Sequence, residues 1–193
     1  GALGGVAGSV ATALGPVGIA AGVASAAIIG IGASSVGVAS NFQSSMSKVN
    51  SVIGGSQADF DKLSQAARDA GATTVFSASQ AADALYYLAS AGYSSDDSVA
   101  ALGSTLNLAG AGGMDLARAS EMLTTDLAVY GLTAKDATMV TDLLAAAASA
   151  SNSGVGQMGD ALALVGGTAK ALGIDIAETT TILSLMENGG TKG

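Results

Sequence analysis

The residues whose types and spacing could support chemistry are two pairs of close carboxylates, Asp59 with Asp61 and Asp96 with Asp97. Neighbouring carboxyl groups can act as general acid and general base when their environments separate their pKa values. Both pairs lie in the first turn of a predicted helix, where an acidic side chain caps the backbone and complements the helix dipole. Since capping accounts for them, we interpret both pairs as structural.

Two glycine-rich segments resemble phosphate-binding loops only in composition. The segment GIGASS at residues 30–35 lacks the last glycine of the dinucleotide-binding fingerprint, and no strand pattern precedes it. The segment GGTAK at residues 166–170 does not have the spacing of a Walker A loop. We therefore predict helix-interior or turn glycines at both places, and no cofactor site.

The absence of whole residue types narrows the possible functions. The chain of 193 residues contains no cysteine and no histidine, which excludes disulfides, thiol nucleophiles, histidine-activated serines and zinc sites built from these ligands. Its net charge is −8, and its seven basic residues are spread singly, so it has no footprint for nucleic acid. We predict that these residues form no enzyme, no metal site and no specific nucleic-acid interface.

The elements that carry these residues are predicted to be helices. Alanine and leucine are abundant, strand-forming residues are not gathered into alternating runs, and the single proline is Pro16. Hydrophobic residues make up 49% of the chain but aromatic residues only 4%, so its core must consist of many small contacts. The composition predicts an all-α fold.

Residues 1–40 are predicted to form an apolar helical segment that is rich in glycine and alanine. The first charged residue is Lys48, and all seven basic and fifteen acidic residues lie from there on. Residues 17–39 are long enough to cross a bilayer core as a helix, which needs about 20 residues. Small residues at four-residue spacing would let such helices pack closely in lipid: Gly18, Gly22, Ala26 and Gly30. Burial inside a protein assembly is the alternative.

Residues 41–76 are predicted to form two bridging helices. The first has one apolar face, with spacings of four, three and four residues between Phe42, Met46, Val49 and Ile53. The glycine pair at residues 54–55 ends it, and Ser56 begins the second helix. We predict that the second helix ends at Gly71.

Residues 77–193 are predicted to form tandem helical hairpins with a repeat of about 40 residues. Three segments share a glycine, an apolar residue, a capping residue, two spacers and an acid, and their glycines are Gly92, Gly131 and Gly173. Glycine can take the left-handed conformation that ends a helix. The capping residues then begin the next helices: Ser94, Thr133 and Asp175. Glycine spacings of 39 and 42 residues are typical of stacked hairpins, although a helical bundle without a true repeat would explain the apolar stripes as well.

A set of motifs, found together in this order, resembles phage tail tape-measure proteins. The run ASNFQSSMSKV at residues 39–49 is similar to the family's A-S-x-F-x-x-x-M-x-x-V segment. It is followed by FDKL at 60–63, AGATTVFSA at 70–78, LASAGY at 88–93 and MENGG at 186–190. The resemblance covers roughly residues 35–193.

Because the chain begins with Gly1 and ends with Gly193, we interpret it as an internal piece of a longer protein. The resemblance implies a long, mostly helical structural protein of the virion. Such a protein lies in the lumen or tip of the tail tube, its length templates the tail, and hydrophobic segments assist genome ejection through the host membrane. The implied partners are further copies of the chain, as a trimer, the tail tube, the tail tip or baseplate hub proteins, and the host membrane. A membrane-inserting pore-forming or toxin-like helical domain is the alternative. A fused wall-cleaving domain would lie outside these residues.

Overall fold

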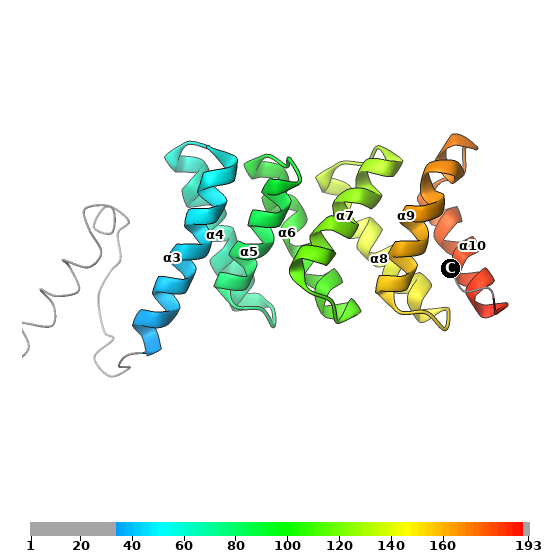
Figure 1. Ribbon diagram of the computed structural model, residues 1–193, viewed down its shortest axis with the longest axis horizontal. Helices are drawn as coiled ribbons and strands as arrows, with labels where there is room; N and C mark the ends of the chain where they lie inside the picture. Colours follow the sequence, from blue (N-terminus) through cyan, green and yellow to red (C-terminus); the bar gives the residue numbers. More distant parts are fainter. Residues whose placement is uncertain (1–33, 191–193) are drawn as a thin grey trace, which may run out of the picture. The chain divides into compact units, whose positions relative to one another are not determined.

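Every regular element that the structure describes is a helix (Figure 1). The computed structural model describes residues 34–190. Its elements are α3 (Ser34–Ile53), α4 (Gln57–Thr73), α5 (Ala78–Ser90), α6 (Ser95–Gly112), α7 (Leu116–Tyr130), the short 3-10 helix η1 (Ala134–Asp136), α8 (Ala137–Ser149), α9 (Val155–Ala171) and α10 (Ile176–Asn188). The prediction of an all-α fold is confirmed over this range.

Most of the predicted apolar segment lies outside the described residues. The predicted packing positions Gly18, Gly22, Ala26 and Gly30 belong to that part, as does the predicted span at 17–39 up to residue 33. Among the helices of residues 34–190, none combines the length and the hydropathy that a crossing of the bilayer requires.

The helices from α4 onward alternate between two layers (Figure 1). In one layer α5 packs on α7 and α7 packs on α9, and in the other α4, α6, α8 and α10 pack each on the next. Each helix also packs on its sequence neighbour in the opposite layer, so the chain zigzags between the layers. The compact unit that contains these helices begins at Gly37, inside α3. The 40-residue repeat and the boundaries at residues 40 and 76 remain predictions.

Helix α3 is attached to the first two helices of this stack through its side chains. The guanidinium carbon of Arg68 on α4 lies 5.2 Å from the centre of the Phe42 ring, and Lys48 Nζ lies 3.9 Å from Asp83 Oδ1 on α5. Met46 and Val49 of α3 are buried in one cluster with residues of α4, α5 and α6. The apolar face predicted for α3 therefore points into the core.

Two clusters of buried side chains hold the layers together. The first contains residues of the helices from α3 through α6, among them Leu63 and Leu85. The second contains residues of the helices from α5 through α10, among them Leu123, Leu144 and Leu162. All five leucines are almost completely buried. Removing the side chain of one such leucine typically costs about 2–5 kcal/mol, so these clusters supply much of the stability of the stack.

Glycines of α9 allow α7 to approach closely. A Cβ atom on Gly159 would lie 2.2 Å from Met122 Sδ, and one on Gly166 would lie 3.0 Å from Tyr130 Cε2. Large side chains of α7 thus fit over positions of α9 that have no side chain. The two helices therefore pack closely, because the large side chains of α7 occupy the space that side chains of α9 would otherwise take.

The three predicted turn glycines share one geometry. Gly92, Gly131 and Gly173 follow α5, α7 and α9 and have positive φ angles of 93°, 68° and 81°. In each turn the amide of the next residue donates a hydrogen bond to a carbonyl five positions earlier, as in the Schellman motif. These bonds join Tyr93 to Leu88 at 3.2 Å, Leu132 to Leu127 at 2.8 Å and Ile174 to Ala169 at 2.9 Å. All three turns lead from the layer of odd-numbered helices to the other layer.

The prediction that a helix ends at Gly71 was wrong. Helix α4 continues to Thr73, and Gly71 has no positive φ angle. A Cβ atom at this position would lie 2.5 Å from the backbone nitrogen of Ala78, at the start of α5. Gly71 is therefore required by the close approach of two backbones and not by a left-handed turn.

Candidate functional site

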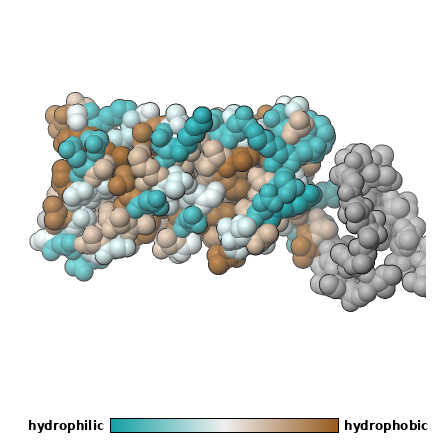
Figure 2. Space-filling view, turned by 180° about the vertical axis from the view of Figure 1, so that it is seen from behind, coloured by the Kyte–Doolittle hydropathy of each residue, from teal (hydrophilic) through white to brown (hydrophobic). Residues whose placement is uncertain are grey.

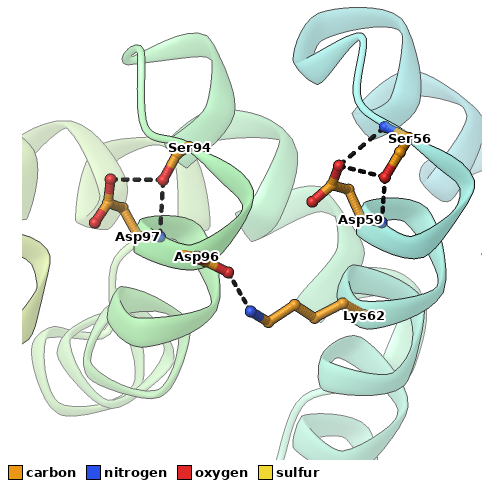
Figure 3. A network of polar contacts seen from close by, with 6 residues as sticks. All are labelled: Ser56, Asp59, Lys62, Ser94, Asp96 and Asp97. Atoms are coloured by element: carbon orange, nitrogen blue, oxygen red, sulfur yellow. Dashed lines mark hydrogen bonds and ion pairs between the residues drawn. The ribbon is translucent and has the colours of Figure 1, made fainter.

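The first acidic pair lies at the start of α4, and Figure 3 shows its member Asp59 beside the cap residue Ser56. The hydroxyl and the amide of Ser56 donate hydrogen bonds to Asp59 Oδ2 at 2.7 and 2.9 Å, and the amide of Asp59 donates to Ser56 Oγ at 3.3 Å. The Ser56 hydroxyl, followed by its amide, lowers the pKa of Asp59 because both favour the charged form. Asp61 accepts a bond of 2.9 Å from Gln57 Nε2. These contacts stabilise the start of α4.

The second acidic pair serves two separate structural contacts (Figure 3). Ser94 Oγ donates to Asp97 Oδ2 at 2.6 Å, and the amide of Asp97 donates to Ser94 Oγ at 3.2 Å, which caps α6. Asp96 forms an ion pair with Lys62 of α4 in the same layer. Both members of this ion pair are at least half exposed, so it contributes about 0–1 kcal/mol.

The other two predicted caps begin different kinds of helix. The amide of Glu178 donates to Asp175 Oδ1 at 2.8 Å, which caps α10. The amide and the hydroxyl of Thr133 each donate to Asp136 Oδ2 at 2.8 Å, and these bonds, the amide first, lower the pKa of Asp136. The element that follows Thr133 is η1, and α8 begins only at Ala137. Thr133 is therefore the cap residue of a short 3-10 helix, which packs against α6 and buries Ala134, and not of α8 itself.

A polar seam between α7 and α9 was missed by the sequence analysis. Arg118 Nη2 lies 2.6 Å from Asp160 Oδ2 and joins the two helices. Two turns further along α7, Asp126 is only 1% exposed, and neither of its carboxylate oxygens has a hydrogen-bond partner. Burial, followed by the charge of Asp160, raises the pKa of Asp126 to about 7.

The last helix, α10, is tied to distant parts of the chain by side-chain hydrogen bonds. Tyr130 Oη donates to Thr179 Oγ1 at 2.9 Å, which links the end of α7 to α10. Asn188 Nδ2 donates to the carbonyl of Ala150 at 2.7 Å, and Ser153 Oγ donates to Glu187. These contacts fix both ends of α10.

Across residues 34–190, no group of three acidic side chains gathers in a way that could hold a metal ion. An open depression beside the α6–α7 turn and the start of α9 includes Met114, Arg118 and Gln157 in its lining, and Arg118 is already paired with Asp160. The polar side chains in this lining serve helix caps and a contact between helices: Asp115 caps α7, Gln157 accepts from the amide of Gly154, and Arg118 pairs with Asp160.

Comparisons with known proteins identify the family of this helical chain. The model of the phage-related minor tail protein family matches residues 64–193. The tape measure protein of Pneumococcus phage Dp-1 is 34% identical over 166 residues, which cover 86% of this chain but only 14% of that protein. No solved structure matches the chain. The chain belongs to the phage-related minor tail protein family, and it is a structural protein of the phage tail.

Proposed function

We propose that this chain is a segment of a tape measure that lies in the lumen or tip of the tail tube and contributes to tail length. The proposal is supported by the family match over residues 64–193 together with the two-layer helical stack in that region. A stack of hairpins grows in one direction as hairpins are added, so its length follows the number of its hairpins. This role needs no catalytic group, cofactor or metal, and we propose none.

Tail length in phage with a duplicated hairpin tests this proposal. The change is an in-frame duplication of residues 149–190, which contain α9 and α10. Packed helices lie about 8–10 Å apart, so a hairpin that joins the stack would lengthen it by roughly 10 Å. The same 42 residues as one continuous helix would add roughly 63 Å, at about 1.5 Å per residue. Electron microscopy of tails would distinguish these cases, and tails of unchanged length would contradict a role in length.

We also propose that copies of this chain associate around the tail axis as a trimer and contact the tail tube and the tip or baseplate hub proteins. The uncharged residues 1–47 support self-association, since such an apolar segment is poorly solvated in a monomer. Sedimentation of the purified chain should show an oligomer at micromolar concentration. A monomer that stays soluble at that concentration would contradict the proposal.

The same uncharged segment is proposed to enter the host membrane during genome ejection. The substitution Ala26→Asp places a charge at the centre of the predicted span and should cost about 2.5–3.5 kcal/mol of insertion. Phage with this substitution should assemble tails of normal length but deliver less DNA, whereas Ser47→Asp, outside the span, should deliver normally. Equal delivery by both variants would contradict the membrane role. If the segment instead makes a pore-forming domain, the purified chain alone should release dye from liposomes.

A further inference from the structure

The C-terminal end of the described stack carries a set of exposed apolar side chains. Large hydrophobic side chains of α9, its C-cap residue and α10 are between 46% and 79% exposed: Leu164, Leu172, Ile182, Leu185 and Met186. Figure 2 shows hydrophobic surface at the end of the molecule that lies on the left in that view. We call these five residues the end face.

Positions of α7 that are equivalent to the end face are covered by the next helix of the layer. When Gly131 is aligned with Gly173, each residue of α7 corresponds to the residue 42 positions later in α9. Met122 corresponds to Leu164, and Met122 is 7% exposed whereas Leu164 is 79% exposed. Met122 is covered because it lies over Gly159 of α9. Likewise Tyr130 lies over Gly166, while its equivalent Leu172 is 73% exposed.

In the layer of even-numbered helices, too, positions of α8 are buried whereas the equivalent positions of α10 are exposed. Val140 and Leu144 of α8 are fully buried and belong to the core cluster that α10 completes. Their equivalents 42 positions later are Ile182 and Met186 of α10, which are 46% and 47% exposed. Both layers therefore end on large apolar residues whose equivalents in the preceding hairpin are covered.

We propose that the end face binds a further helical hairpin that continues both layers in register. Its first helix would present small residues to Leu164 and Leu172, as α9 presents Gly159 and Gly166 to α7. Its second helix would present an apolar face to the three side chains of α10. The proposed partner is thus a helical hairpin of the same kind as those that form the stack. The related tape measure protein of phage Dp-1, of which this chain covers 14%, has length for many such hairpins.

The proposal is tested by adding the hairpin to the chain. Residues 149–190 are appended after Gly190, so that the second copy follows the first with the 42-residue spacing of the alignment. The extended chain should unfold in one cooperative transition at a higher temperature than the original chain. Amides of the added helices should exchange at least about tenfold more slowly than in an extended chain that carries Leu164→Asp and Leu185→Asp. The same two substitutions in the chain without extension should leave its melting temperature unchanged, because both side chains are exposed there.

Three results would overturn the proposal. The added residues could unfold in a separate transition, or they could exchange equally fast with and without the two aspartates. In the third case, the original chain would form dimers in sedimentation that Leu164→Asp abolishes, and the amides of the appended hairpin would remain unprotected from exchange. That outcome would assign the end face to a second copy of the chain.

Discussion

Tyr130 and Thr179 are joined by a hydrogen bond of 2.9 Å between their hydroxyl oxygens, although 49 positions separate them in the sequence. Thr179 Oγ1 in turn donates to the carbonyl of Asp175 at 2.7 Å, the residue that caps α10. The ring of Tyr130 lies over Gly166 of α9. One side chain at the end of α7 therefore contacts both helices of the hairpin that follows.

Removal of the Tyr130 hydroxyl should weaken this connection. Tyr130→Phe keeps the ring over Gly166 but removes the donor to Thr179, so the free energy of unfolding should fall by about 0.5–1.5 kcal/mol. Tyr87→Phe, at a partly exposed position, should change it by less than about 0.5 kcal/mol. Chemical denaturation measures both values. Equal effects of the two substitutions would show that the bond contributes nothing.

The buried carboxyl of Asp126 should make stability depend on pH. Its pKa is raised from 3.8 to about 7 in the folded chain, so the folded state binds the proton more tightly than the unfolded state. This contribution to stability is fully present below the unfolded pKa and is lost as pH rises toward about 7. Asp126→Asn removes that loss and should raise the free energy of unfolding at pH 8 by about 1–3 kcal/mol.

The contribution of Asp126 is measured by comparing the free energy of unfolding in urea at about pH 5 with that at about pH 8. The difference in stability between the two pH values should be smaller in Asp126→Asn than in the natural chain. Asp142→Asn, an exposed position on α8, should keep the natural difference. An unchanged pH difference in Asp126→Asn would mean that this carboxyl is already ionised in the folded state at pH 5.

Two glycine substitutions within helices should have opposite effects. In Gly71→Ala the new Cβ would meet the backbone of Ala78 at 2.5 Å, and the overpacking should cost about 1–3 kcal/mol. In Gly103→Ala the new Cβ has open space on α6, so the better helix propensity should add about 0.5–1 kcal/mol. Thermal unfolding followed by circular dichroism measures both. A stabilising Gly71→Ala would disprove the close approach of α4 and α5.

The left-handed turn at Gly92 should resist branched side chains. Its φ angle is 93°, and a Cβ atom there would meet nothing within 4 Å, so backbone strain alone decides the effect. Gly92→Val should cost about 1–2 kcal/mol, and Gly92→Asn should cost less because asparagine tolerates this region. If denaturation gave equal stability for both variants and the natural chain, the turn would not be left-handed in solution.

Local features of this fold could be predicted from the sequence alone. The bonds between Ser94 and Asp97 and between Asp175 and Glu178 join residues three positions apart, so their partners are visible in any seven-residue window. A turn glycine such as Gly131 is likewise followed at once by its apolar and capping residues. Family membership could also be predicted, since its motifs are runs of adjacent residues.

Other features depend on neighbours that only the tertiary structure brings together. Gly71 reads as a helix end in sequence, but the start of α5 determines its role. Nothing in the sequence marks Asp126 among the other acids, yet its burial, followed by the charge of Asp160 on α9, raises its pKa. Leu164 and Met122 occupy equivalent positions, yet only Met122 is covered by a following helix. Burial depends on the atoms that surround a side chain, and in this stack those atoms belong to neighbouring helices, which local sequence patterns do not place.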